Sequence, residues 1–112
     1  MTTIFGKIIR RELPADIVYE DEWCLAFRDI NPQAPTHVLL IPKKEIDTLT
    51  SATPEDQSLL GHMMLAAGNV ARKLGVSDTF RIVVNNGAGA GQTVFHLHLH
   101  ILAGRKLNWP PG

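Results

Sequence analysis

The sequence predicts an α+β fold, in which an antiparallel sheet of about five strands carries one long helix and a short N-terminal helix. Three observations lead to this fold class. Short runs rich in β-branched and aliphatic residues recur along the chain and are separated by turn residues. One long segment, 53–75, has apolar residues at helical spacing, and its two ends carry residues typical of a helix N-terminus and a helix C-terminus. The chain has 112 residues, 45% of them hydrophobic and 20% charged, which suits a single domain over 1–112.

The first predicted elements are a short helix and a hairpin. Residues 4–11 carry apolar side chains at helical spacing and predict a helix that ends before Pro14, because the residue before a proline avoids helical geometry. The runs 17–20 and 24–29 predict two strands joined by an acidic turn. A proline-containing loop then leads to residues 36–42, whose aliphatic content indicates a buried central strand.

The middle of the chain predicts one helical turn over 46–49 and then the long helix. Thr53 can cap this helix, Pro54 suits its first turn, and Gly75 suits its C-terminal end. Two adjacent apolar stripes run along it, which is wider than one sheet contact needs. One stripe is therefore expected to meet a second copy of the chain. The alternative is a helix that is simply well buried in a monomer.

The remaining predicted elements are a strand over 80–85, a glycine-rich loop over 85–93, and a final strand over about 94–102. The last of these contains the alternating run His96-Leu97-His98-Leu99-His100. Successive strand residues point to opposite faces, so the three imidazoles should share one face while the leucines enter the core. Burying three imidazoles needs partners for their six ring nitrogens, so a purely structural role is unusual.

Two kinds of chemistry fit these histidines. A zinc site would combine a His-x-His pair with a third histidine such as His37. Phosphate chemistry would use His98 as the nucleophile, with loop amides, Asn85, Gln92 and Thr93 stabilising charge on the phosphoryl oxygens. We favour phosphate chemistry, because a glycine-rich loop suits an anion and no carboxylate lies along the histidine strand to orient metal ligands.

Several other side chains have two possible roles. Asp29 ends a strand and is either a turn carboxylate or an acceptor for ribose hydroxyls. His62, on the long helix, has no histidine near it in sequence and is expected to be structural or at the surface. The apolar residues that form either plain core or a slot for a nucleobase are Ile4, Phe5, Ile8, Phe27 and Ile30.

Composition excludes several classes of partner. Eleven basic and eleven acidic residues give no net charge, so no nucleic-acid-binding face is indicated. No apolar run approaches the roughly 20 residues needed to cross a membrane. The one cysteine, Cys24, can form no intrachain disulfide and is expected to be a buried thiol in a reducing compartment. Residues 1–6 lack the pattern of a signal peptide, so a cytoplasmic protein is expected.

The run from His96 to Leu102 has the form His-φ-His-φ-His-φ-φ, where φ is apolar, and resembles the signature of the histidine triad (HIT) superfamily. Five further stretches are similar to its HINT branch, the histidine triad nucleotide-binding proteins: IFGKII at 4–9, LAFRDI at 25–30, PQAPTH at 32–37, IPKK at 41–44 and WPPG at 109–112. The resemblance covers nearly the whole chain, and these matches favour the HINT branch over the dinucleotide-cleaving and uridylyltransferase branches.

This resemblance implies a single HIT domain in a homodimer whose two sheets join into one. It implies hydrolysis of purine nucleoside phosphoramidates, such as AMP-NH2 or AMP-lysine, through a nucleotidyl-histidine intermediate on His98 and without a metal or cofactor. His96 and His100 would support His98, and His37 would be the further histidine of the site. The implied substrate contacts are Asp29 and Ile30 at the ribose, Asn85, Gly91, Gln92 and Thr93 at the phosphate, and Trp109 reaching toward the partner's site.

Two other functions remain open at this point. The first is a nucleotide-binding or scaffolding dimer with little turnover. The second is a metal-binding module.

Overall fold

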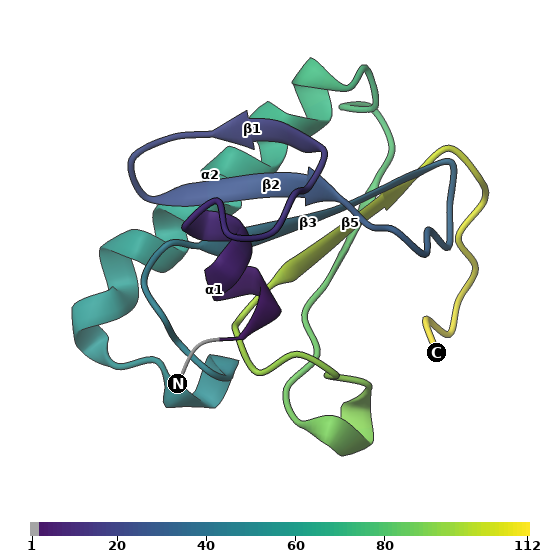
Figure 1. Cartoon of the computed structure of the whole chain (residues 1–112). Helices are drawn as coiled ribbons and strands as arrows, with labels where there is room; N and C mark the ends of the chain where they lie inside the picture. Colours follow the sequence, from purple (N-terminus) through teal and green to yellow (C-terminus); the bar gives the residue numbers. More distant parts are fainter. Residues whose placement is uncertain (1–2) are drawn as a thin grey trace.

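Five antiparallel strands form one sheet in the order β1-β2-β3-β5-β4, with two α-helices packed against it (Figure 1). The computed structural model describes residues 3–112, so the part of the signal-peptide expectation that falls on Met1 and Thr2 lies outside the described residues. The elements are α1 Ile4–Ile9, β1 Ile17–Glu20, β2 Cys24–Arg28, β3 Thr36–Pro42, α2 Gln57–Lys73, β4 Arg81–Val83 and β5 Leu99–Ala103, with 3-10 turns at Leu49–Ser51, Pro54–Asp56 and Ala88–Ala90. The predicted α+β fold class is confirmed. Over the described range, no helix combines the length and the hydropathy that crossing a membrane requires.

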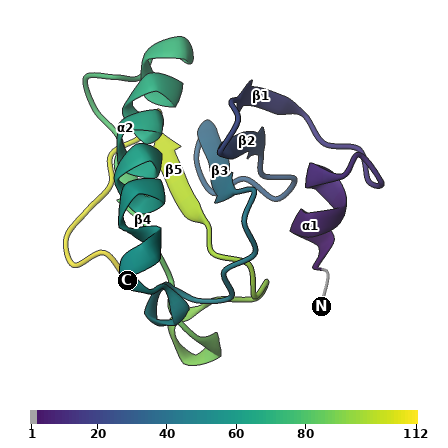
Figure 2. The same cartoon turned by 90° about the vertical axis from the view of Figure 1, so that its left-hand side faces the viewer.

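The sheet separates two hydrophobic clusters, because alternate strand residues point to opposite faces. Figure 2 shows α2 on one side of the sheet and α1 on the other. In the central strand, Val38 and Leu40 pack with α2, whereas Leu39 and Ile41 pack with Phe5 and other residues on the α1 side. The central strand is therefore buried on both faces, as its aliphatic sequence predicts.

Helix α1 is shorter than the sequence predicts. Thr3 caps it by accepting a hydrogen bond from the Gly6 N–H at 3.2 Å. The helix ends at Ile9, because Arg11 takes a left-handed backbone conformation with φ 61°, well before Pro14. The prediction of a helix over 4–11 is therefore correct in type and two residues too long.

Helix α2 ends at Lys73, as its sequence predicts, but it begins only at Gln57, because a 3-10 turn over Pro54–Asp56 occupies the predicted first turn. Gly75 follows it with φ 75°, a conformation that glycine adopts without steric cost. Both predicted apolar stripes are largely buried within this chain. Val70 and most of their other members pack against the sheet, but Met64 is 57% exposed, and the neighbouring Leu65 is 75% exposed.

Three predicted elements differ from the structure. The 3-10 turn begins at Leu49 instead of spanning 46–49, and β4 covers only three residues of the predicted strand over 80–85. The final strand begins at Leu99, not near residue 94. Continuing its pairing past Leu99 would bring it opposite Pro42, which has no N–H to donate to a ladder. The preceding segment instead donates the Leu97 N–H to the Ile46 carbonyl at 2.6 Å.

The pairing of β3 with β5 positions two histidines. His37 lies opposite Leu102, and His100 lies opposite Leu39, so the two histidines are diagonal neighbours on one face of the sheet. The alternation places both imidazoles on the α1 side, away from α2. A one-residue slip in this register would move one of the two imidazoles to the other face.

Replacing Ile101 with alanine should lower the free energy of unfolding by about 2–5 kcal/mol, because its side chain is 0% exposed in the core between the sheet and α2. Ile30 is 100% exposed and supplies a matched control, whose alanine variant should change stability by less than about 0.5 kcal/mol. Urea unfolding followed by circular dichroism measures both. Equal losses in the two variants would contradict the assignment of the core.

Candidate active site

His98 is held in one protonation form by its neighbour. Its Nδ1 lies 2.7 Å from the backbone carbonyl of His96, and a carbonyl can only accept a hydrogen bond. Nδ1 therefore carries the hydrogen, and in the neutral ring Nε2 keeps a free lone pair. No described residue forms a hydrogen bond with this Nε2. Among the described residues every fully buried side-chain nitrogen has a hydrogen-bond partner, so an unpaired Nε2 is not fully buried and is reachable from solvent.

A chain of hydrogen bonds fixes the forms of His37 and His100. The Gln33 N–H donates to His37 Nδ1 at 3.0 Å, so the neutral His37 ring carries its hydrogen on Nε2. This Nε2–H donates to His100 Nδ1 at 2.9 Å. A neutral His100 consequently carries its own hydrogen on Nε2. The sequence run Pro32 to His37 thus determines which nitrogen of His100 is a donor.

Burial keeps the imidazoles of His98 and His100 neutral. Desolvation is the main cause that lowers the pKa of His98 below its ordinary value. Desolvation, together with repulsion from His98 and His37, lowers the pKa of His100 to about 4. Both rings are therefore uncharged at neutral pH, with a free lone pair on His98 Nε2 and a hydrogen on His100 Nε2.

His96 forms hydrogen bonds through both its ring and its backbone carbonyl. Its ring is buried, and Nε2 donates to the Pro42 carbonyl at 2.8 Å. Its own carbonyl is the acceptor that orients His98. His96 thus contacts His98 through its backbone, and it precedes β5 instead of lying on it.

Asp29 joins the histidine cluster from the end of β2. Its Oδ2 lies 3.4 Å from His37 Nε2, while its Oδ1 accepts the Asn31 N–H at 2.9 Å as a turn carboxylate does. Asp29, His37 and His100 each offer a ligand atom within 4.8 Å of the others. The histidine strand itself carries no carboxylate, but Asp29 brings one to the histidines from the end of β2. The lack of a carboxylate on that strand therefore no longer argues against a metal.

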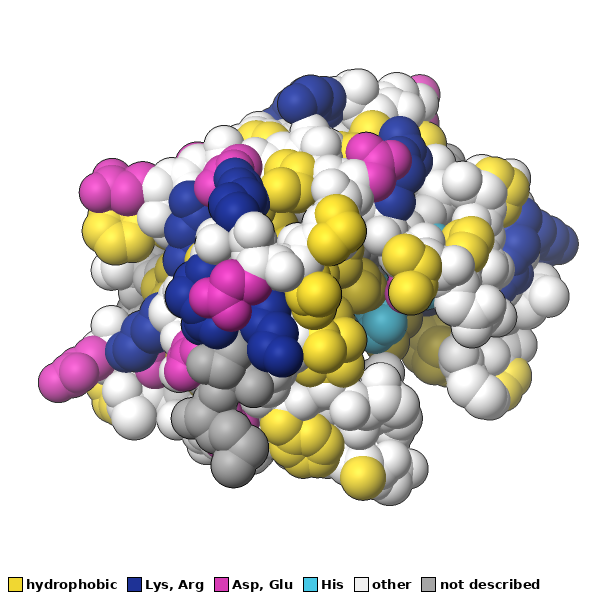
Figure 3. Space-filling view, viewed as in Figure 1, with side chains coloured by type: hydrophobic (Ala, Val, Ile, Leu, Met, Phe, Trp, Pro, Cys, Tyr) yellow, Lys and Arg dark blue, Asp and Glu magenta, His cyan; other side chains and the backbone are white. Residues whose placement is uncertain are grey.

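An apolar wall borders the histidines. The Phe5 ring packs edge-on against His98, with ring centres 5.1 Å apart, and against Phe27, at 5.3 Å. Phe5, Ile8 and Phe27 are buried in the cluster on the α1 side, whereas Ile30 is fully exposed and is not core. In Figure 3 a histidine lies at the bottom of a hollow bordered by hydrophobic side chains.

The glycine-rich loop is more ordered than its sequence predicts. Residues 88–90 form a 3-10 turn in which Ala90 and Gly91 donate their backbone N–H groups inside the loop. These amides are not free for an anion. The buried Gln92 side chain accepts the Gly87 N–H at 2.8 Å and donates to the Asp47 and Val94 carbonyls at 2.8 and 3.1 Å.

Gln92 thus shapes the loop instead of offering a free donor to a phosphate, because its backbone N–H also bonds within the loop, to Gly87. Thr93 is exposed. Gly91 has φ 103°, and a side chain there would meet the Asn85 amide nitrogen at 3.5 Å. Asn85 and Gly91 are therefore neighbours, although six positions separate them in sequence.

Hydrogen bonds connect the C-terminal segment to the edge strand β4. Arg81 on β4 donates from Nη2 to the carbonyls of Leu107 and Asn108, at 3.0 Å each. The next residue, Trp109, is exposed, and among the described residues its ring pairs with none of the site's aromatic rings. The structure thus leaves Trp109 outside this chain's histidine site.

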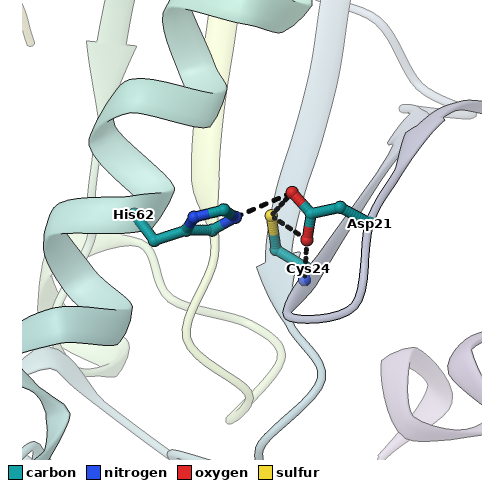
Figure 4. A group of neighbouring side chains, drawn as sticks. All are labelled: Asp21, Cys24 and His62. Atoms are coloured by element: carbon teal, nitrogen blue, oxygen red, sulfur yellow. Dashed lines mark hydrogen bonds and ion pairs between the residues drawn. The ribbon is translucent and has the colours of Figure 1, made fainter.

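Sequence reasoning missed a second cluster of chemically reactive side chains. His62, expected to be structural or at the surface, donates from Nε2 to Asp21 Oδ2 at 2.7 Å, and Cys24 lies beside the same carboxylate (Figure 4). Burial, with Asp21 adjacent, raises the pKa of the Cys24 thiol to about 12, so the expected buried thiol is confirmed. The sequence carried no signal for this cluster, because 41 positions separate Asp21 from His62.

Comparison with known proteins agrees with this fold. The family model for the HIT domain matches residues 10–107. A "HIT-like protein" of Synechocystis is 69% identical over 110 residues, which is 98% of this chain and 96% of that one. The "14 kDa zinc-binding protein" of Zea mays is 50% identical over 98% of this chain and 88% of its own.

Two solved structures extend the comparison. A HIT family hydrolase from Legionella pneumophila has a TM-score of 0.96 at 47% identity, covering 99% of this chain and 100% of its own. A histidine triad nucleotide-binding protein from Candida albicans has a TM-score of 0.83 at 28% identity, covering 97% and 83%. The chain belongs to the HIT domain family, as its histidine signature predicts.

The low pKa of His100 should make stability depend on pH. Its pKa of about 4 in the folded protein lies below the ordinary 6.5 of an unfolded chain, so between these values only the unfolded state binds the proton. The free energy of unfolding should therefore fall as the pH is lowered from about 6.5 toward about 4. Denaturant unfolding at several pH values should show a flatter dependence in His100→Gln, and an unchanged slope would contradict this origin.

Proposed function

We propose that this protein hydrolyses purine nucleoside phosphoramidates, of the AMP-NH2 or AMP-lysine type, through a covalent intermediate on His98. The observation that carries the proposal is the neutral His98 ring, whose Nδ1–H is held by the His96 carbonyl and whose Nε2 lone pair is free. An imidazole nitrogen in this form is a competent nucleophile toward phosphorus. The name of the Legionella protein supports hydrolysis, and the name of the Candida protein supports a nucleotide as the ligand.

The proposed reaction has two steps. His98 Nε2 attacks the α-phosphorus, so a P–N bond to histidine forms while the P–N bond to the amine breaks, and the amine leaves with a proton from solvent. Water then attacks the phosphorus of the nucleotidyl-histidine. The bond to His98 breaks, the nucleotide keeps the oxygen, and a proton returns to solvent.

Neighbouring groups would stabilise the charge that develops on the phosphoryl oxygens. The His100 ring centre lies 5.0 Å from that of His98, and its Nε2–H would donate to a phosphoryl oxygen. Asn85 beside Gly91 and the exposed Thr93 hydroxyl supply the donors from the loop. Asp29 would hold the ribose beside Ile30, and the buried wall of Phe5, Ile8 and Phe27 would border the base.

We further propose that the protein acts as a homodimer. Met64 and Leu65 expose apolar surface on α2, which a monomer would leave in water. On the same helix, Gly61 has no atom within 4 Å of an added Cβ, so another backbone can approach closely there. Strand β4 lies at one edge of the sheet, and its free side would let two sheets join. Trp109 would then reach the partner's site.

His98→Asn should abolish release of AMP from adenosine 5′-monophosphoramidate, lowering the rate by at least about 10³-fold because the nucleophile is removed. The assay uses chelator-treated protein, and the wild type should stay active under this condition. His62→Gln is the matched control on the far side of the sheet and should keep the wild-type rate. Binding of AMP without hydrolysis would favour a nucleotide-binding dimer instead. Activity that chelation removes and zinc restores would assign a metal to the histidines.

Leu65→Glu should convert the protein to single chains, since it places a charge on the exposed face of α2. Sedimentation equilibrium or light scattering measures the mass. Leu13→Glu is the control, because Leu13 is 38% exposed and lies before β1, away from α2. A wild type that is already monomeric, or a Leu65 variant that remains dimeric, would refute this interface.

A further inference from the structure

A second group of metal-ligand side chains lies on the side of the sheet opposite to His98. Asp21 lies in the turn between β1 and β2, Cys24 begins β2 and packs on the α2 side, and His62 lies on α2 (Figure 4). Each offers one ligand atom, and the three atoms lie within 4.8 Å of one another. We propose that Asp21, Cys24 and His62 form a zinc site whose fourth ligand is a water molecule.

The distances suit a tetrahedral ion. Ordinary zinc bond lengths give edges of about 3.5 Å between thiolate sulfur and carboxylate oxygen, and about 3.3 Å between imidazole nitrogen and oxygen. Cys24 Sγ lies 3.5 and 3.6 Å from the two oxygens of Asp21. The His62 Nε2 to Asp21 Oδ2 distance of 2.7 Å is that of a direct hydrogen bond. This edge would lengthen by about 0.6 Å when an ion replaces the hydrogen. Cys24 Sγ and His62 Nε2 lie within 4.8 Å of each other.

The carboxylate is held in place independently of His62. Its Oδ1 accepts the backbone N–H groups of Trp23 and Cys24 at 2.8 and 2.9 Å. Its Oδ2 accepts the Tyr19 hydroxyl at 3.0 Å. Such outer hydrogen bonds orient a metal-binding carboxylate, so the turn would present Asp21 to the ion without further ordering.

Of the three proposed ligands, His62 borders a surface hollow, from which a water molecule could approach the ion. A hollow of about 730 Å³ between the hairpin turn and the first turns of α2 is lined by His62, Trp23 and Leu59, among others. Two lysines also line it, but Lys43 pairs with Glu20 at 2.8 Å and Lys44 pairs with Asp56 at 2.6 Å. Their charges are therefore compensated. Three protein ligands with one open position is the arrangement of zinc sites that keep a water.

The chemistry of the ligands selects the ion. A thiolate and an imidazole favour zinc over magnesium or calcium, which prefer oxygen ligands. Binding would release the Cys24 thiol proton to solvent and move the His62 hydrogen from Nε2 to Nδ1. The ion would then join the β1–β2 turn to α2 and stabilise the folded state by mass action.

The test uses metal-free, reduced, full-length protein titrated with Co²⁺ as a spectroscopic substitute for Zn²⁺. The wild type should bind one equivalent with a near-ultraviolet charge-transfer band from a thiolate ligand, and Zn²⁺ should displace it and raise the melting temperature. Cys24→Ala and His62→Gln should lose the band. Ser58→Gln, which lines the same hollow one turn away, should keep it.

Controls separate this site from the histidine cluster on the other face. His37→Gln should keep the band, because His37 lies with Asp29 and His100. The proposal fails if the folded wild type shows no thiolate band, or if His37→Gln removes binding while His62→Gln does not. His62 is 38% exposed, so His62→Gln decides the matter even if Cys24→Ala does not fold. Hydrolysis of the phosphoramidate is a separate assay, and its failure would leave this result unaffected.

Discussion

The register between β3 and β5 is the constraint on which the rest of the structure depends. Because β3 is buried on both faces, its alternate side chains have to match α2 on one side and the α1 cluster on the other. The same alternation places His37 Nε2 at 2.9 Å from His100 Nδ1 on the α1 side. The hydrophobic pattern that stabilises the fold and the placement of the imidazoles are therefore one property of the sequence, and a change of register would lose both together.

Burial gives the histidines their chemistry at a cost in stability. An imidazole in water is partly charged near neutral pH, whereas desolvation lowers the pKa of both His98 and His100 here. Backbone groups then select the useful neutral form: the His96 carbonyl leaves His98 Nε2 unprotonated, and the Gln33 N–H leaves His100 with a donor at Nε2. No charged side chain is needed to fix the neutral form of His98, because the His96 carbonyl already determines which nitrogen carries the hydrogen.

Local signals in the sequence were enough to predict most elements. The run 36–42 matches β3 because its aliphatic pattern and closing proline are local features, and the histidine alternation singles out His98 without any tertiary information. The late start of β5 could not be predicted, since it depends on which residue Pro42 would face across the sheet. The role of Gln92 in shaping the loop could not be predicted either, because its side-chain amide donates to the carbonyl of Asp47, 45 positions away in sequence. Partners distant in sequence, such as Asp21 and His62, become visible only in the folded chain.

The histidine cluster and the cluster of Asp21, Cys24 and His62 lie on opposite faces of one sheet and have different chemical properties. Strand β2 sends Cys24 to the α2 side and Phe27 to the α1 side, so one strand contributes to both. On the α1 side the imidazoles are neutral and next to an apolar wall, which suits covalent attack on phosphorus. On the α2 side a carboxylate that accepts three other hydrogen bonds faces a thiol and an imidazole, which suits a cation. Because the buried central strands separate the clusters, an ion at Cys24 would change stability without entering the chemistry at His98.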